Sequence, residues 1–142
     1  MTENEFHLKE AKSCNNKTWS ILDKTEDSEQ DRDEAIRLVN TSYHHWRIVG
    51  EPVNFQRAEY MLAKVYNKFG LKELALHHAR NCEQLTKEHN FKDFDLAFSY
   101  EILYESIKVM VKRKRAKHTL KRLNKQEMRL PIKRIEKFSL MN

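Results

Sequence analysis

The sequence is poor in the residues that interrupt or cross-link a chain. Its 142 residues include only two glycines, two prolines and two cysteines. So few helix-breaking residues, together with 34% charged and 39% hydrophobic residues, predict a helix-rich chain long enough to bury a core as one domain. Cys14 and Cys82 have no cysteine at metal-binding or redox-motif spacing. They predict reduced thiols in a cytoplasmic protein.

Long hydrophobic runs are also lacking. No stretch approaches the roughly 20 apolar residues that a membrane-spanning helix needs. The first residues, MTENEFHLKEAK, are polar and acidic and lack the apolar segment of a secretory signal. We therefore expect a soluble, cytoplasmic protein with no membrane partner.

Charge is distributed unevenly along the chain. Residues 1–111 contain 15 Lys and Arg against 19 Asp and Glu, a net charge of −4, whereas residues 112–142 contain 12 against 2, a net charge of +10. A shift of this size indicates a change in organisation. We predict a helical domain over residues 1–110 and a basic C-terminal tail over 111–142, with one short helix at about 114–128 ahead of Pro131.

Apolar spacing and capping residues predict five helices before the tail. The first covers about residues 4–24, and the second runs to about Val49 behind an N-cap at Thr25 or Ser28. The others are expected at Asn54–Phe69, Leu71–Glu88 and Phe91–Met110, with Asn54 and Asn90 as N-caps. Because the connections are short, neighbouring helices must be antiparallel.

Two helices repeat internally. SYHHWRIV at 42–49 aligns with ALHHARNC at 75–82, an offset of 33 residues. AEYMLAKVY at 58–66 aligns with KDFDLAFSY at 92–100, an offset of 34. Two independent helices repeating at nearly one period predict an all-α fold of stacked antiparallel helical hairpins, with five to six helices.

The repeated residues resemble the tetratricopeptide repeat. The resemblance rests on a run that reads Leu62, Ala63, Tyr66, Gly70, Ala75 and Ala79. The run departs from the family where a large aromatic is expected at Ala79 and where a closing proline is expected. Residues 5–110 also resemble a family of uncharacterised bacterial proteins of similar length, which implies a fold but no activity.

The tail departs from that resemblance, because such relatives continue with a glycine turn and a mildly charged last helix. One hypothesis is a shifted reading frame. If one nucleotide is inserted after the Met110 codon, A-rich codons for the following residues read GKEKKSKTYIEK and onward, with a glycine turn and near-balanced charge. The nucleotide sequence beyond Met110 tests this hypothesis, because codons incompatible with the second frame would exclude it.

The tetratricopeptide resemblance implies a groove lined by the first helix of each hairpin. It suggests a non-enzymatic module that binds a protein or peptide, and an aromatic and basic groove would suit an acidic, hydrophobic segment. An alternative is that the two phenylalanines of this set are covered by the first or last helix and form core. The groove candidates are Arg57, Tyr60, Lys64, Asn67, Phe94, Phe98 and Glu101.

A second alternative is a polar site that binds a metal or a small ligand. Such a site could also be enzymatic. Its members would be His45, His78, Asp95 and Glu101, with the first three as metal ligands. No HExxH or CxxC spacing supports a metal site. A purely structural role is the alternative, in which the two histidines hydrogen-bond between packed hairpins. We assign no cofactor and no catalytic residue.

A third alternative is nucleic-acid binding through the basic tail, whose lysines and arginines could neutralise phosphates. The tail contains Phe138 as its only aromatic residue for base stacking, which disfavours nucleic acid as a partner. Self-association is a further expectation, because a chain without a proper final helix would expose an apolar face.

Overall fold

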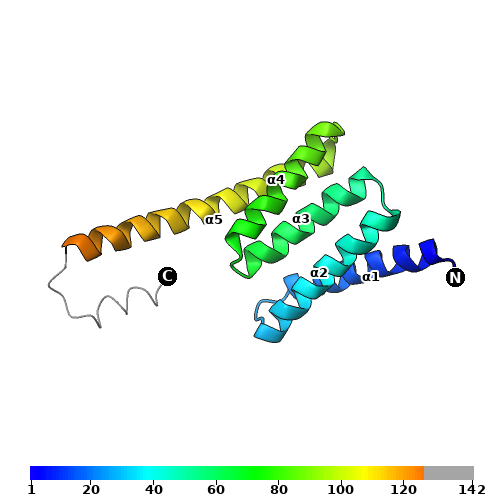
Figure 1. Ribbon diagram of the computed structural model, residues 1–142, viewed down its shortest axis with the longest axis horizontal. Coiled ribbons are helices and arrows are strands. Elements are labelled where there is room, and N and C mark those ends of the chain that lie inside the picture. Colours follow the sequence, from blue (N-terminus) through cyan, green and yellow to red (C-terminus); the bar gives the residue numbers. More distant parts are fainter. Residues whose placement is uncertain (127–142) are drawn as a thin grey trace. The chain divides into compact units, whose positions relative to one another are not determined.

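The computed structural model describes residues 1–126, with side chains described as far as residue 123. Five helices follow one another: α1 (Glu3–Leu22), α2 (Glu29–Val49), α3 (Pro52–Lys68), α4 (Lys72–Glu88) and α5 (Asp93–Gln126) (Figure 1). There is no strand in this part of the chain. The predicted all-α stack of helical hairpins is confirmed: α1 packs on α2, α3 on α4, and α2 on α3.

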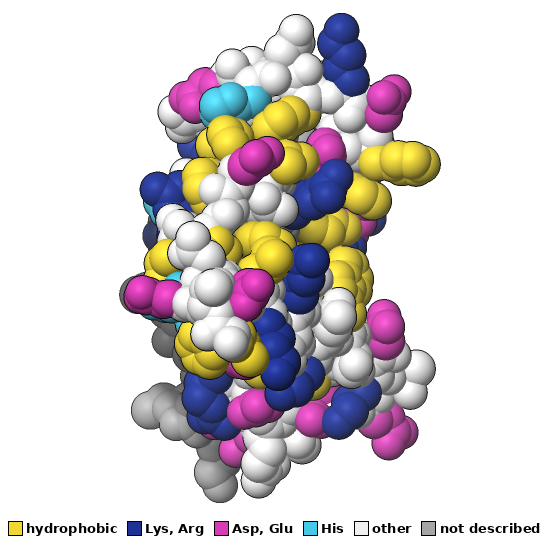
Figure 2. All heavy atoms as spheres, turned by 90° about the vertical axis from the view of Figure 1, so that its right-hand side faces the viewer, with side chains coloured by type: hydrophobic (Ala, Val, Ile, Leu, Met, Phe, Trp, Pro, Cys, Tyr) yellow, Lys and Arg dark blue, Asp and Glu magenta, His cyan; other side chains and the backbone are white. Residues whose placement is uncertain are grey.

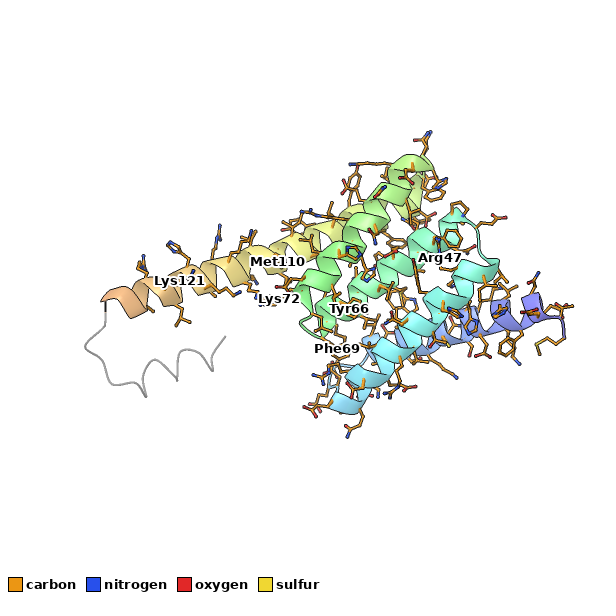
Figure 3. The ribbon with its side chains drawn as sticks, in the orientation of Figure 1. Arg47, Tyr66, Phe69, Lys72, Met110 and Lys121 are labelled. Atoms are coloured by element: carbon orange, nitrogen blue, oxygen red, sulfur yellow. The ribbon has the colours of Figure 1, made fainter. Side chains whose placement is uncertain are left out.

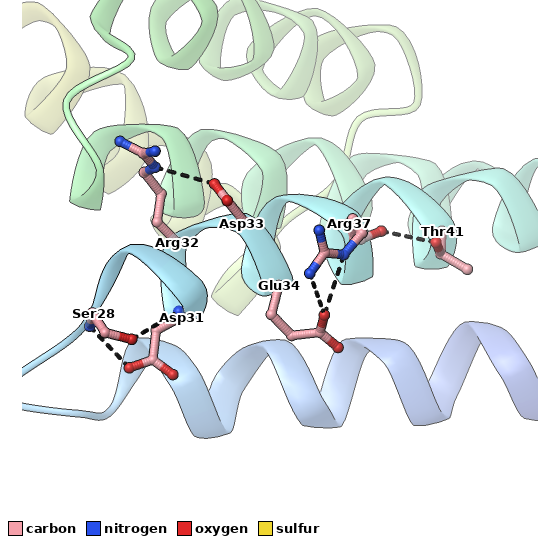
Figure 4. A network of polar contacts seen from close by, with 7 residues as sticks. All are labelled: Ser28, Asp31, Arg32, Asp33, Glu34, Arg37 and Thr41. Carbon is pink, nitrogen blue, oxygen red and sulfur yellow. Dashed lines mark hydrogen bonds and ion pairs between the residues drawn. The ribbon is translucent and has the colours of Figure 1, made fainter.

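Local capping explains where the first two helices begin. Thr2 and Glu5 form a capping box, in which each side chain accepts a hydrogen bond from the other residue's backbone N–H. Ser28, one of the two predicted caps, does the same with Asp31 ahead of α2. The polar contacts that Figure 4 draws along the first turns of this helix are exposed, including the Arg37–Glu34 ion pair at 3.0 Å.

The predicted N-cap at Asn54 is wrong. Helix α3 begins two residues earlier, at Pro52, because proline already has the backbone angle of a first helical turn and its missing N–H is not needed there. The Asn54 side chain instead accepts a hydrogen bond from the backbone N–H of Glu51 at 2.9 Å.

Asn90 was predicted to start the fifth helix, but it ends the fourth. Its φ of 54° is left-handed, as is the φ of 78° at Gly70 after α3. The next residue closes each turn in the same way: Leu71 N–H donates to the Tyr66 carbonyl at 2.9 Å, and Phe91 N–H donates to the Thr86 carbonyl at 3.0 Å. Asparagine can replace glycine here because it tolerates this backbone conformation better than most residues.

Small residues bring the helices close together. Six alanines are buried at the helix contacts, and Leu62, Val65, Cys82 and Ile102 fill the space between them. The alanines are Ala11, Ala35, Ala58, Ala63, Ala75 and Ala79. The repeat alignment is only partly reflected in the packing: Ser42 and its counterpart Ala75 are both buried, whereas Ala63 is buried and its counterpart Ala97 is exposed.

The chain divides after Ile107 into two units. In the first unit, α5 buries Ser99, Ile102 and Ser106. In the second, residues 114–126 continue α5 rather than forming a separate helix. The end of the predicted short helix at 127–128 and the rest of the tail, including Pro131 and Phe138, lie outside the described residues. Within the described part, no helix has both the length and the apolar character required to cross a bilayer.

Candidate functional site

A hollow of about 310 Å³ lies between the odd-numbered helices of the first unit. We call it the aromatic hollow. Its walls include two partly exposed aromatic rings, Trp19 (37% exposed) from α1 and Phe98 (39%) from α5. The Tyr60 ring of α3 lies 5.2 Å from the Phe98 ring, centroid to centroid. The full lining is Asn15, Trp19, Gln56, Arg57, Tyr60, Met61 and Phe98.

A second hollow, of about 440 Å³, shares Trp19 with the first. We call it the polar hollow, because charged and amide side chains make up most of its lining: Trp19, Leu22, Asp23, Lys64, Asn67, Lys68 and Glu105. Both hollows are lined by α1, α3 and α5, the first helices of successive hairpins. We call this side of the first unit the groove face.

The cations of the groove face are already paired. Arg57 Nε donates to Asp95 Oδ1 at 2.9 Å, and this hydrogen bond raises the pKa of the guanidinium. Lys64 Nζ contacts Glu101 at 2.7 Å and Glu105 at 3.3 Å. Burial lowers the pKa of Lys64, but its hydrogen bond to Glu101 and the neighbouring charges outweigh burial and raise it. The positive field predicted for this groove is therefore largely compensated by the chain's own carboxylates.

Tyr60 connects the aromatic and charged parts of the groove face. Its side chain is 7% exposed, and burial raises its pKa to about 12. Its hydroxyl donates to Glu101 Oε1 at 3.3 Å. The phenol is therefore held neutral at physiological pH and acts as a hydrogen-bond donor.

Asn67 leaves one polar atom unmet at the wall of the polar hollow. Its Nδ2 donates to Ser106 Oγ at 3.0 Å, but its Oδ1 is buried with no hydrogen-bond partner among the described residues. An unmet buried acceptor costs about 1–3 kcal/mol. A donor that reached this oxygen would recover part of that free energy.

Two groove candidates behave differently from each other. Phe98 lines the aromatic hollow, whereas Phe94 is 78% exposed and contacts the Phe98 ring at 6.4 Å between centroids. Neither ring is buried in the core, so the alternative that both form core is wrong.

The four residues of the predicted polar site have different partners. His45 Nδ1 lies 2.8 Å from His7 Nδ1, and burial, together with the nearby His7 and His44, lowers the pKa of His45. His78 Nδ1 lies 2.6 Å from Glu59 Oε2. Asp95 and Glu101 pair with Arg57 and Lys64 as described above. No three His, Cys, Asp or Glu side chains of the described residues are grouped to hold a metal ion.

Sequence reasoning missed several residues of the groove face. Trp19 was not among the groove candidates, yet it lines both hollows. Gln56 was not identified, although its side chain is 1% exposed and donates to Thr86 Oγ1 at 3.1 Å and to the Asp95 carbonyl at 2.8 Å. Gln56 could have been noticed as a polar residue on α3, a helix whose residues are mostly buried.

Comparisons with known proteins add no neighbour. The chain matches no family model, no curated protein and no solved structure. The tetratricopeptide resemblance therefore stays a prediction, and the groove face has to be interpreted from its own chemistry.

Proposed function

We propose that this chain is a non-enzymatic module that binds a protein or peptide segment on its groove face. The observation that supports this proposal is the pair of aromatic rings, Trp19 and Phe98, that stay more than a third exposed on either side of a hollow. Exposed aromatic side chains beside a pocket are typical of protein-binding hot spots. Hairpins of tetratricopeptide type, which we also propose, would present their first helices in this way.

The size of the aromatic hollow suggests its occupant. A volume of about 310 Å³ is near the lower end of the roughly 300–1,000 Å³ range of ligand pockets. We infer that one large apolar side chain of the partner enters here, while the partner's backbone lies along the polar hollow. Asn67 Oδ1, an acceptor without a hydrogen-bond partner among the described residues, is buried in the wall on that side.

The charge pattern changes the expected partner. Arg57 and Lys64 are paired with Asp95, Glu101 and Glu105, so an acidic segment would have to compete with these carboxylates. An apolar anchor with neutral polar neighbours therefore suits the groove face better than the acidic segment predicted from the sequence.

The linings favour binding over nucleophilic chemistry. The side chains lining the two hollows include no serine, cysteine or histidine. The two cysteines are both free and buried, which supports our proposal of a reducing, cytoplasmic setting. The metal or small-ligand alternative has no geometric support in the described residues, because its four members have separate partners.

A peptide selection tests the proposal. Peptides of about 12 residues would be selected from a random library on the purified chain, and their dissociation constants measured for Trp19→Ala and Phe98→Ala. We expect each substitution to weaken binding at least about tenfold, or roughly 1.4 kcal/mol. Ile48→Ala is the matched control, because Ile48 is 49% exposed on α2 and lines neither hollow.

Tryptophan fluorescence gives a second readout. With Trp46→Phe, Trp19 is the only tryptophan, and its emission should shift to shorter wavelength as the aromatic hollow is filled. If no peptide is selected, or if selected peptides bind Trp19→Ala as tightly as Ile48→Ala, the groove face is not the binding surface. Melting curves of each variant exclude unfolding as the cause.

A further inference from the structure

The second half of α5 has an unusual charge composition. Between Lys108 and Gln126 there are nine lysines and arginines and no aspartate or glutamate. All of them lie on one continuous helix, part of which Figure 3 shows at Lys121 with side chains projecting along its length. Like charges placed this densely repel one another, so the segment is stabilised by any polyanion that neutralises it.

Six of these side chains are exposed and carry no ion pair to any described residue. They are Lys112, Lys114, Arg115, Lys117, Lys121 and Arg122. The contrast with the groove face is direct, since Arg57 and Lys64 are both paired there. The six charges are therefore available to a ligand.

Helical geometry sorts the six charges onto two flanks. At about 100° per residue, a narrow, half-buried strip is formed by Val109, Ala116, Leu120 and Leu123. Around the helix, one flank of this strip carries Lys112, Arg115 and Arg122. The opposite flank carries Lys117, Lys121 and Lys114. A helix with cations on both flanks can reach negative charges on two parallel lines.

We propose that residues 108–126 bind double-stranded DNA, with the helix lying in the major groove and its two basic flanks contacting the phosphates of the two strands. The major groove is about 12 Å wide and admits one α-helix. The contacts are electrostatic, so we infer binding that is largely independent of base sequence. This site shares no residue with the groove face, and it does not depend on the proposed peptide binding.

Other polyanions fit the segment less well. Single-stranded nucleic acid is held largely by aromatic stacking, and residues 108–126 contain no Phe, Tyr or Trp. Duplex RNA has a major groove too deep and narrow for side chains to read. A membrane surface needs a bulky apolar face with aromatic residues, whereas the strip here offers four aliphatic residues and no aromatic one. The shortage of aromatics thus disfavours single strands but does not affect duplex binding.

Salt-dependent binding tests the proposal on the full chain. Fluorescence anisotropy of a labelled duplex of about 20 base pairs, between 50 and 200 mM NaCl, should show a log–log slope near −5 if six phosphates are neutralised. That slope corresponds to a loss of about a thousandfold in affinity across this range. A single strand of the same sequence should bind more weakly at every salt concentration.

A pair of matched variants locates the site. Replacing Lys112, Lys114, Lys117 and Lys121 with glutamine removes four charges and keeps helix propensity, and the slope should become shallower by about 3.6. Replacing Lys9, Lys12, Lys17 and Lys92 with glutamine removes the same charge from exposed positions of the first unit and should leave the slope unchanged. Trp19→Ala should also bind duplex normally.

Three outcomes would overturn the proposal. The first is an equal effect of the two quadruple variants, which would mean that net charge alone drives binding. The second is a slope shallower than about −2, which would correspond to two phosphate contacts. The third is tighter binding to vesicles containing anionic lipid than to the duplex at the same salt concentration, which would assign the helix to a membrane surface.

Discussion

Residues 1–107 and residues 108–126 are both helical, but for different physical reasons. In the first region, helices bury one face against a neighbour, and charged side chains such as Lys64 and Glu101 are paired across helices. In the second region, no described residue from Lys108 to position 123 is fully buried. Residues 108–126 also contain no aspartate or glutamate among their lysines and arginines. Helix formation there rests on the high propensity of lysine, arginine, alanine and leucine. The comparison shows that equal secondary structure does not imply equal stability.

The position of charge differs as much as its amount. Between positions 93 and 107, α5 carries four acidic residues and no basic ones, whereas from 108 onward it carries only basic residues. Acidic residues near a helix N-terminus and basic residues near its C-terminus both interact favourably with the helix dipole. The sequence of α5 therefore supports one long helix in spite of the self-repulsion in its second half.

Hydrogen exchange should show the largest difference between the two regions. Amides around Leu62 in α3 exchange only through extensive unfolding, because this helix is the most buried of the five. Amides around Lys117 have no buried packing to break and should open at a free energy lower by about 4 kcal/mol, or roughly a thousandfold in protection. Similar protection in both places, measured by NMR or mass spectrometry, would show that the second region is as stable as the first.

The same substitution in each region gives the next largest contrast. Leu62→Ala removes a side chain that is 1% exposed and should lower the free energy of unfolding by about 2–5 kcal/mol. Leu120→Ala removes a half-buried side chain from the second region and should change it by less than about 0.5 kcal/mol. Urea unfolding followed by circular dichroism measures both, and comparable losses would contradict the contrast.

A buried polar contact should matter more than an exposed one within the first region. Glu59 is 5% exposed and contacts His78 at 2.6 Å, so Glu59→Gln should cost about 1–3 kcal/mol. Glu34→Gln removes an exposed partner of Arg37, and we expect a loss below about 0.5 kcal/mol. Thermal or urea unfolding at neutral pH measures the free energy of unfolding of both variants. Equal losses would mean that burial does not strengthen the contact between Glu59 and His78.

The smallest predicted effect is an alkaline loss of stability caused by Cys82. Burial raises the pKa of this thiol from 9.0 to about 12, so between these values the thiol ionises in the unfolded chain but not in the folded one. Its contribution is complete below pH 9 and falls as the pH rises, by at most about 1.4 kcal/mol per pH unit. Between pH 8 and pH 10, wild type should therefore lose about 1.4 kcal/mol more than Cys82→Ala. Parallel curves for the two proteins would show that the buried thiol does not titrate in this way.

Much of the fold could be predicted from the chain alone. The helix ends at Val49 and Glu88 and the N-cap at Ser28 follow from local chemistry, because capping side chains and helix-breaking residues act within a few positions. The errors arose because asparagine has more than one use near a helix end: Asn54 caps from within the first turn of α3, and Asn90 follows the last turn of α4. Only the surrounding turn selects between the two uses.

The site was less predictable than the fold. Arg57, Lys64 and Phe98 were named as groove candidates from the tetratricopeptide resemblance, but their partners could not be predicted. The Arg57–Asp95 and Lys64–Glu101 pairs join residues 38 and 37 positions apart. No local spacing rule relates residues so distant. The two histidines that matched in the repeat, His45 and His78, likewise have unrelated partners in His7 and Glu59.

By itself, the sequence determined that this protein is helical, where most of its helices end, and that its basic charge is concentrated near the C-terminus. These properties depend on periodicity, capping and composition, which act over one or two helical turns. Tertiary structure alone decided that Trp19 and Phe98 face one hollow and that the groove cations are neutralised. Those properties depend on which helices meet, and contacts between distant residues are set by packing of the whole chain rather than by any short segment of it.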